Sequence, residues 1–306
     1  MRIGIDLGGT KTEGIALADD GRELARRRVD SGRHYAATVE TIAGLVEHLE
    51  HAAGARGTVG VGIPGTVTGA GVVKNANSVW INGQPLGTDL EARLGRPVRL
   101  MNDANCFALS EATDGAAAGA AVAFGVILGT GVGGGVVVGG RCLVGANLVG
   151  GEWGHNPLPW PADDERPGPP CYCGKRGCIE SFLSGPGLER DHAAHAGQAL
   201  ASRDIVRAAG AGDADARATM ARYHERLSRA LATIVNVLDP DVIVLGGGLS
   251  NVPGVAEAAE AGLGRWVFSD TVVTPVVRNR HGDSSGVRGA AWLWPAEAAG
   301  PGGAAG

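Results

Sequence analysis

The sequence has no long apolar run, no excess of basic residues and few cysteines, and each of these absences argues against a class of protein. No stretch approaches the roughly 18 apolar residues that a membrane-spanning helix needs. The 306 residues carry a formal net charge of −5, which argues against binding to nucleic acid or to an anionic membrane. The amino-terminal segment MRIGIDLGGTK lacks the architecture of a signal peptide, so we expect a cytoplasmic protein.

Three of the five cysteines stand in one short segment, CYCGKRGC at 171–178. In the reducing cytoplasm such a cluster indicates metal or redox chemistry rather than disulfides, and the redox pattern C-x-x-C is absent from it. The C-x-C-x₄-C spacing, with one histidine upstream, predicts a closed tetrahedral site that has no place for water and therefore a structural Zn²⁺. The predicted zinc ligands are His155, Cys171, Cys173 and Cys178. The isolated Cys106 and Cys142 are expected to be small buried residues.

The 52 glycines are the compositional excess, and many of them lie in turns between apolar segments. IGIDL (3–7) and EGIAL (13–17) are typical of strands, and GGTKT between them predicts a hairpin turn. The segment GVILGTGVGGGVVVGG (125–140) predicts a second hairpin, with Gly125 standing 121 residues after Gly4. This internal repeat predicts two similar α/β halves.

Apolar periodicity and chain breakers predict the remaining elements. We expect helices over 36–53, 104–119, 216–238 and 286–294, and buried strands over 59–65, 97–105 and 241–251. Residues 156–170 hold six of the 15 prolines and are expected to form an irregular loop. The predicted domains are 1–117 with a carboxyl-terminal helix at about 287–298, and 118–286 with the zinc-binding loop; the tail 299–306 is expected to be disordered.

The two glycine hairpins have features of phosphate-binding turns. In such a turn, backbone N–H groups and Thr10 can approach phosphate oxygens, Lys11 adds positive charge, and Asp6 can bind Mg²⁺. Each turn alone is equally compatible with an ordinary hairpin, but the duplication and the glycine edge of DVIVLGGG favour a nucleotide gripped across a cleft. The predicted ATP contacts are Gly4, Asp6, Gly8, Gly9, Thr10, Lys11, Gly129, Thr130, Gly131, Gly133, Gly246, Gly247 and Gly248.

Two common nucleotide-binding motifs do not account for these turns. The P-loop pattern GxxxxGK followed by Ser or Thr does not occur in the sequence. A GxGxxG match at Gly129, Gly131 and Gly134 is followed by more strand sequence (VVV) rather than by a helix, so a Rossmann dinucleotide site is disfavoured.

Polar residues in two further segments are candidates for chemistry on a substrate hydroxyl. Asp103, beside Asn102 at the start of a helix, is placed to accept a proton, as phosphoryl transfer to an alcohol requires. From this stretch alone, capping of the helix by Asp103 is an equally good explanation. In GEWGHNP, Glu152 and His155 stand three residues apart, so a helical or tight-turn backbone places them side by side for a polyhydroxylated substrate.

Seven segments of the sequence occur in the order found in the ROK family of sugar kinases, repressors and related proteins, which this chain resembles. They are GIDLGGTK, GIPG, NDAN, LGTGVGGG, GEWGH, C-x-C-G-x-x-G-C-x-E and VLGGG. The resemblance covers nearly the whole chain and implies the actin-like, ribonuclease H-like ATPase fold of two α/β domains with a nucleotide and sugar cleft between them. More narrowly, VVKNANSVWINGQPL and GEWGHNPLPW look like bacterial fructokinases of the manno(fructo)kinase type, with N-acetylglucosamine kinases as close relatives.

The resemblance also implies roles for individual residues. Asp103 matches the catalytic base of the family, and His155 matches a residue that binds zinc with one ring nitrogen and faces the sugar with its other side. The implied sugar contacts are Gly65, Asn77, Asn102, Asp103, Glu152, His155 and Glu180. The proline-rich, acidic insert at 161–170 is the least family-like part of the core, and the tail has no expected counterpart.

These inferences predict an ATP-dependent hexose kinase that phosphorylates the 6-hydroxyl of D-fructose, and also mannose, with Mg²⁺ accompanying ATP. Kinases of N-acetylglucosamine or glucose are the alternative, because they use the same chemistry and differ in a few pocket contacts. A ROK repressor is disfavoured because the first hairpin begins at Ile3 and leaves no helix-turn-helix before it. A redox or zinc-only module would leave both hairpins and Asp103 without a role. A homodimer is the family expectation.

Overall fold

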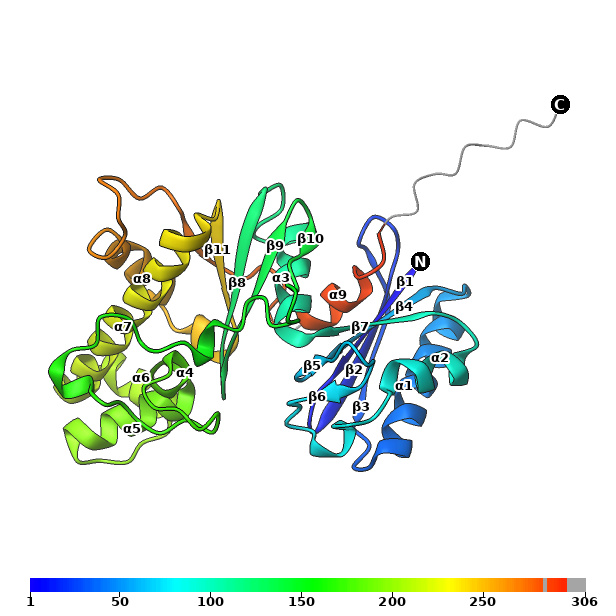
Figure 1. The fold of residues 1–306 in the computed structure, drawn as a ribbon, viewed down its shortest axis with the longest axis horizontal. Helices are drawn as coiled ribbons and strands as arrows, with labels where there is room; N and C mark the ends of the chain where they lie inside the picture. The colour runs from blue at the N-terminus through cyan, green and yellow to red at the C-terminus, as the bar shows by residue number, and fades with distance from the viewer. Residues whose placement is uncertain (283–284, 296–306) are drawn as a thin grey trace. The chain divides into compact units, whose positions relative to one another are not determined.

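A computed structural model of the chain describes residues 1–282 and 285–295 (Figure 1). The chain divides into two compact units, one formed by Met1–Cys106 with the residues from Gly286 onward and the other by Phe107–Ser285. Each unit contains a five-stranded sheet with helices. Compared with the predicted ranges 1–117 and 118–286, this division differs mainly in that it falls within helix α3 (Asp103–Asp114).

The first unit is built on a sheet with the strand order β3-β2-β1-β4-β7. The pairs β1–β2 and β2–β3 are antiparallel, whereas β1–β4 and β4–β7 are parallel. The elements of this unit are β1 (Arg2–Leu7), β2 (Lys11–Leu17), β3 (Glu23–Asp30), α1 (Tyr35–Ala53), β4 (Thr58–Ile63), β5 (Thr66–Val67), β6 (Val73–Lys74), the 3₁₀ helix η1 (Val79–Ile81), α2 (Leu86–Leu94), β7 (Val98–Asn102) and most of α9 (Ser285–Ala291).

The second unit has a sheet with the strand order β10-β9-β8-β11-β12. Here β8–β9 and β9–β10 are antiparallel, whereas β8–β11 and β11–β12 are parallel. Its elements are β8 (Val122–Leu128), β9 (Val132–Val138), β10 (Arg141–Cys142), η2 (Trp153–His155), η3 (Asp163–Glu165), α4 (Ile179–Leu183), α5 (Gly185–Ala196), α6 (Ser202–Ala211), α7 (Ala214–Leu238), β11 (Val242–Gly246), η4 (Gly248–Asn251), α8 (Val255–Leu263) and β12 (Val276–Arg278).

The two sheets share one topology, which confirms the internal repeat predicted from the glycine hairpins. In each sheet an antiparallel hairpin is followed by two strands that continue the sheet in parallel. The hairpin strands are β1 and β2 in the first unit and β8 and β9 in the second. The repeat seen in the sequence therefore extends beyond the hairpin to a whole half of the fold.

Glycines in these strands admit helices that pack closely on the sheets. A Cβ atom on Gly4 would overlap the carbonyl oxygen of Val287 in α9, and one on Gly246 would overlap the ring of Phe107 in α3. These contacts give Gly4 and Gly246 a role in packing, because any larger residue would push the helix away from the sheet. Their contact with a nucleotide stays a prediction.

The predicted helices are confirmed where their apolar faces are strong. The helix predicted over 36–53 is α1, which buries an apolar face formed by Val39, Ile42, Ala43, Val46 and Leu49. It ends at Gly54, whose φ of 67° is left-handed and is adopted by glycine without strain. α7 confirms the amphipathic helix predicted over 216–238. Among the described residues, no helix is both long and apolar enough to cross a membrane.

The last helix is shorter than predicted. α9 ends at Ala291, and the backbone N–H of Leu293 donates to the carbonyl oxygen of Ala290 in a tight final turn (3.2 Å). Pro295 follows closely, and the residue before a proline is disfavoured in α conformation. The rest of the range 287–298 and the predicted disordered tail at 299–306 lie outside the described residues.

Candidate active site

The turn of the first hairpin is held by the end of the neighbouring strand β3. The turn closes through a hydrogen bond from Gly8 N to Lys11 O (3.1 Å), and Ser31 N donates to Thr10 O (2.9 Å). The hydroxyl of Ser31 donates to Gly8 O at 2.7 Å. Ser31 holds the turn by donating to the carbonyl oxygens of Gly8 and Thr10. This arrangement suits a turn whose N–H groups face an anion.

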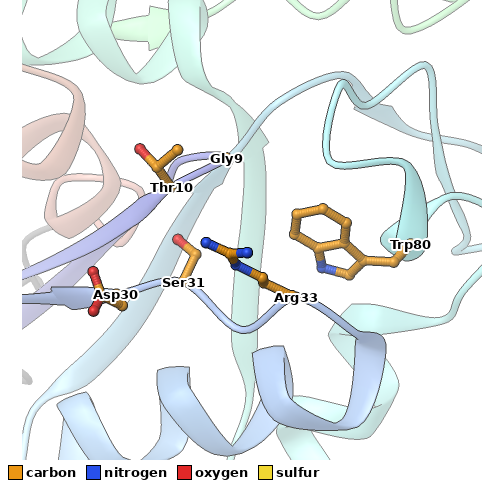
Figure 2. Close-up of a pocket in the computed structure, with 6 residues that line it drawn as sticks. All are labelled: Gly9, Thr10, Asp30, Ser31, Arg33 and Trp80. Atoms are coloured by element: carbon orange, nitrogen blue, oxygen red, sulfur yellow. The ribbon is translucent and has the colours of Figure 1, made fainter.

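A pocket of about 350 Å³ adjoins this turn within the first unit (Figure 2). The side chain of Arg33 lies between Ser31 and the indole of Trp80, and Trp80 Nε1 donates to Thr38 Oγ1 at 2.9 Å. The pocket therefore offers a cation, hydroxyl groups and an aromatic ring. Arg33 and Trp80 were not predicted as site residues, because neither belongs to a recognisable spacing. The lining residues are Gly9, Thr10, Asp30, Ser31, Arg33 and Trp80.

Asp103 lies where it was predicted, as the first residue of α3 directly after β7. Its neighbour Asn102 caps the helix, since Asn102 Oδ1 accepts from Ala104 N (2.9 Å) and Asn105 N (3.3 Å). Ala104 N also lies 2.7 Å from Asp103 Oδ1. The helix start is thus capped by Asn102 from outside the helix, so capping does not by itself account for a carboxylate at 103.

Asn102 also ties this helix start to the loop that carries two other predicted sugar contacts. Its Nδ2 donates to the carbonyl oxygen of Gly65 at 2.9 Å. Gly65 has a φ of 75°, and a Cβ there would overlap the backbone of Lys74, three residues before the exposed Asn77. The structure therefore brings Gly65, Asn102 and Asp103 together and runs the segment before Asn77 alongside them.

Asp6 lies in β1 of the same unit and is electrostatically coupled to Asp103. Burial, followed by the charges of Asp103 and Glu13, raises the pKa of Asp6 to about 7, against the opposing effect of Arg28. Each carboxylate disfavours ionisation of the other, and a divalent cation bound between them would offset this repulsion. The pair therefore fits the predicted Mg²⁺ site.

The turn of the second hairpin is held by Glu180 rather than by a strand. Val132 N donates to Glu180 Oε2 at 2.9 Å, and a Cβ on Gly131 would stand 2.7 Å from the same oxygen. On the other side of the turn, Gly185 N at the start of α5 donates to Gly129 O at 2.8 Å. A predicted phosphate turn and a predicted sugar contact thus meet within the second unit.

The GEWGH segment is fixed against the second sheet by its tryptophan. Trp153 is buried, its ring packs edge-on against Phe124 with centroids 5.7 Å apart, and its Nε1 donates to Gly133 O at 2.9 Å. Glu152 directly precedes the 3₁₀ helix η2, and His155 is its last residue. Because a 3₁₀ helix has three residues per turn, this backbone suits the side-by-side placement expected of Glu152 and His155.

The four predicted zinc ligands form one cluster in the second unit. One ligand atom from each of the four lies within 4.8 Å of those from the other three. The Cys173 and Cys178 Sγ atoms are 3.6 Å apart, and Cys171 Sγ is 3.6 Å from His155 Nδ1. Two sulfur ligands of a tetrahedral zinc ion are about 3.8 Å apart, whereas a disulfide joins its sulfurs at about 2 Å. The donor set and the spacing therefore fit zinc, and all three cysteines are free.

Tyr172, between two of these cysteines, is a feature that the sequence analysis missed. Its hydroxyl lies 3.0 Å from His155 Nε2, and the two rings meet edge-on with centroids 5.1 Å apart and an interplanar angle of 88°. Tyr172 is 82% exposed as a whole, but partial desolvation of its hydroxyl, followed by the charge of Glu180, raises the pKa of Tyr172 to about 12. No sequence spacing distinguishes such a tyrosine from an ordinary loop residue.

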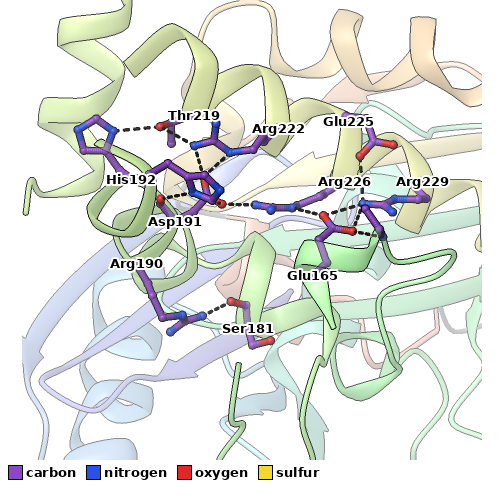
Figure 3. A network of polar contacts seen from close by, with 12 residues as sticks. Glu165, Ser181, Arg190, Asp191, His192, Thr219, Arg222, Glu225, Arg226 and Arg229 are labelled. Atoms are coloured by element: carbon purple, nitrogen blue, oxygen red, sulfur yellow. Dashed lines mark hydrogen bonds and ion pairs between the residues drawn. The ribbon is translucent and has the colours of Figure 1, made fainter. Parts of the chain in front are cut away.

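Glu165 docks the proline-rich insert onto helix α7 (Figure 3). Its buried carboxylate accepts hydrogen bonds from Arg226 Nε (2.6 Å) and from Arg229 (2.8 Å), and Arg226 also binds Asp191 of α5 at 2.6 Å. Burial opposes ionisation, but the hydrogen bonds hold the pKa of Glu165 below its ordinary value. The insert is irregular, as predicted, yet it is anchored by a buried ion network that the sequence did not reveal.

The predicted sugar contacts are divided between the two units. Gly65, Asn77, Asn102 and Asp103 belong to the first unit, and Glu152, His155 and Glu180 to the second. The same division applies to the predicted phosphate turns. Each unit therefore contains one phosphate turn together with a group of sugar contacts.

Comparison with known proteins extends over nearly the whole chain. The model of the ROK family matches residues 2–297. An N-acetyl-D-glucosamine kinase of Escherichia coli O139:H28 is 41% identical over 300 residues, which cover 96% of this chain and 99% of that protein. The structure of a ROK hexokinase from Thermus thermophilus superposes with a TM-score of 0.85 and 36% identity, covering 95% of this chain and 96% of the other. A ROK family glucokinase from Streptomyces griseus, in complex with glucose and AMPPNP, superposes with a TM-score of 0.75 and 28% identity, covering 95% and 97%.

Proposed function

We propose that N-acetyl-D-glucosamine is the substrate of this chain. The chain belongs to the ROK family and is an ATP-dependent sugar kinase of the actin-like ATPase fold. The observation that carries the proposal is the 41% identity to an N-acetyl-D-glucosamine kinase over 96% of the chain. Sugars that differ at one position are discriminated by a few contacts worth about 1–3 kcal/mol each. Similarity over almost the full length of both proteins therefore supports the substrate better than any single motif does.

D-Fructose, with mannose, is the second candidate. It rests on the likeness of segments such as VVKNANSVWINGQPL and GEWGHNPLPW to fructokinases of the manno(fructo)kinase type. These segments include the loop that bears Asn77 and the helix η2 with His155. They belong to the proposed sugar site, so they bear on specificity, but they cover a small part of the chain.

In the proposed reaction, Asp103 accepts the proton of the sugar 6-hydroxyl while that oxygen attacks the γ-phosphorus of ATP. Asn102 holds the start of α3 and thereby orients Asp103. Glu152, His155 and Glu180 bind the other hydroxyls, which both donate and accept hydrogen bonds. The N–H groups of the two hairpin turns stabilise the charge that develops on the phosphoryl oxygens. ADP and the sugar 6-phosphate are the products.

Asp6 is the residue we assign to the divalent cation that accompanies ATP. When bound there, Mg²⁺ would neutralise phosphate charge. The raised pKa of Asp6 and its coupling to Asp103 support this assignment, since ionisation of both carboxyls is costly without a cation. We assign Asp6 an orienting role and Asp103 the proton transfer.

We assign zinc to His155, Cys171, Cys173 and Cys178, where it would act as a structural ion. The same segment leads from His155 through the cysteines to Glu180, which is two residues beyond Cys178. Ligation at this point would therefore fix two of the proposed sugar contacts relative to each other.

We also expect the family's homodimer, which sedimentation of the purified protein would test.

A coupled assay of ADP formation tests the substrate proposal. We expect kcat/KM for N-acetyl-D-glucosamine to exceed the values for fructose, mannose and glucose by about tenfold or more. The product should carry its phosphate at the 6-position, which ³¹P and ¹³C spectroscopy would identify. A preference for fructose or mannose would overturn the substrate in favour of the second candidate, and inactivity toward every sugar would overturn the kinase assignment.

A further inference from the structure

Tyr172 is held at its hydroxyl and presents its ring to solvent. The side chain is 82% exposed in the structure, whereas its hydroxyl contacts His155 Nε2 at 3.0 Å. The ring meets the His155 imidazole only by its edge. Burial of an aromatic ring in the core usually explains a tyrosine in a folded domain, and that explanation does not apply here.

Zinc bound at the proposed site would determine the direction of the hydrogen bond between these two residues. His155 Nδ1 is the ring atom that faces Cys171 Sγ, at 3.6 Å, so Nδ1 is the nitrogen placed to bind the metal. A histidine that ligates through Nδ1 carries its proton on Nε2 and donates it to a neighbouring group. With zinc on Nδ1, the Tyr172 oxygen would accept this bond, and its own O–H would remain as a donor for another partner.

The hydroxyl of Tyr172 also touches one of the proposed sugar contacts. It lies 3.0 Å from Nε2 of His155, the last residue of the helix η2 that Glu152 directly precedes. Glu180 is itself fixed by the N–H of Val132 in the second hairpin. A phenol beside an imidazole of the proposed sugar site is well suited to hydroxyl groups of a sugar, and an exposed ring can cover an apolar sugar face.

We propose that Tyr172 is a sugar-binding residue: its oxygen accepts the Nε2 proton of His155, its hydroxyl donates to a hydroxyl of the sugar, and its exposed ring covers the bound sugar. The proposal rests on the proposed function, because it concerns the sugar of the same site. It also adds to the role implied for His155. The side of the imidazole away from zinc would contact the sugar jointly with the phenol of Tyr172.

Steady-state kinetics of the zinc-loaded full-length protein would test this role, with Tyr172→Phe as the main variant. We expect KM for N-acetyl-D-glucosamine to rise about tenfold, because a hydrogen-bonding partner of the sugar and of His155 is lost. The kcat, the KM for ATP and the zinc content should stay close to those of the wild type. Tyr172→Ala should raise the sugar KM further, because the ring is lost as well.

The matched control is Tyr35→Phe, which removes a phenol in the first unit that donates to Asp89. Its sugar KM should stay within about twofold of the wild type, since neither partner belongs to the sugar site. Deoxy analogues of the sugar sharpen the test: the penalty of Tyr172→Phe should disappear for the analogue that lacks the contacted hydroxyl.

Three outcomes would overturn the proposal while the kinase assignment stands. An unchanged sugar KM in Tyr172→Phe would remove the contact, and an equal penalty for every deoxy analogue would show an indirect effect. Loss of zinc from Tyr172→Phe would make the tyrosine a structural part of the metal loop. If the wild type phosphorylates no sugar at all, the proposed function fails first and this inference fails with it.

Discussion

The two hairpins of this chain have equivalent strands in sheets of the same order, but different groups hold their turns. The first turn is braced by Ser31, at the end of the adjacent strand β3. The second is braced by Glu180 and by the start of α5, both of which follow the zinc loop. Two hairpins with equivalent strands are therefore held at their turns by different groups.

The difference also separates two kinds of chemistry. The first unit carries the carboxyl groups of Asp6 and Asp103, which interact with each other. The second carries the cluster of predicted zinc ligands and Glu180, together with the buried ion network around Glu165. If Asp103 of the first unit performs proton transfer and the metal loop of the second holds sugar contacts in place, changes at these two places should have separable effects.

The largest effect is expected from Asp103→Asn in the first unit. Without the base, kcat should fall about a thousandfold, whereas the dissociation constant of the sugar should change by less than about twofold. The control Glu257→Gln removes an exposed carboxylate from the first turn of α8 and should leave kcat unchanged. An Asp103→Asn variant that kept most of its turnover would show that Asp103 is not the base.

The next largest effect is expected on the stability of the second unit. Glu165→Ala leaves Arg226 and Arg229 buried without their shared carboxylate, which should cost about 3–5 kcal/mol of unfolding free energy. Glu225→Ala removes a more exposed partner of the same Arg229 and should cost less than about 1 kcal/mol. Urea denaturation of both variants measures the two values. Equal losses of unfolding free energy in the two variants would mean that burial of the Glu165 ion pairs contributes nothing to stability.

A pH-dependent effect is expected in the first unit. Because the pKa of Asp6 is raised from 3.8 to about 7, the folded state holds a proton that the unfolded state has released. The associated stability is complete below about pH 4 and is lost as the pH rises through about 7, which amounts to about 3 kcal/mol between pH 5 and pH 8. Asp6→Asn should remove this part of the pH dependence, as urea denaturation at several pH values would show.

The control for this pH effect is Asp20→Asn, which changes an exposed carboxylate in the turn between β2 and β3. Its pH profile should follow that of the wild type, because this substitution leaves Asp6 and the charges that act on Asp6 unchanged. A flat wild-type profile between pH 5 and pH 8 would contradict the raised pKa of Asp6.

The smallest of these effects is expected from loss of the metal in the second unit. Cys173→Ser should abolish the zinc content of about one ion per chain, raise the sugar KM about 10–100-fold, and leave the KM for ATP less affected. Cys142→Ser, outside the cluster and with its thiol pKa raised by burial to about 12, should keep the metal. Full zinc content in the Cys173→Ser variant, measured by metal analysis, would contradict the ligand set.

Much of the fold was predictable because its signals are local. The hairpin β1–β2, the helix α1 with its Gly54 cap and the repeat of the hairpins all depend on residues a few positions apart. The cysteine spacing likewise predicted a set of ligands that the structure brings together. Short-range spacing reflects backbone geometry, which is the same wherever the segment occurs.

The glycines show where such reasoning is incomplete. Gly4 and Gly246 were predicted as ATP contacts, which stays untested, and the structure shows that α9 and α3 pack against these two glycines. Both explanations predict a missing side chain, so only the position of the packed helix distinguishes them. The early end of α9 was missed for a related reason, since periodicity continued past the tight turn before Pro295.

The sequence by itself determined the family, the two hairpins and the set of one histidine and three cysteines that cluster in the second unit, because each depends on residue types at short or recurring spacings. Tertiary structure decided which groups hold those elements in place. Glu180 meets Val132 across 48 residues, and Glu165 meets Arg226 across 61. Such contacts arise only when whole elements dock, and no local pattern encodes the result. The hydrogen bond between Tyr172 and His155, 17 residues apart, belongs to the same group, because the metal loop must fold back on itself to make it.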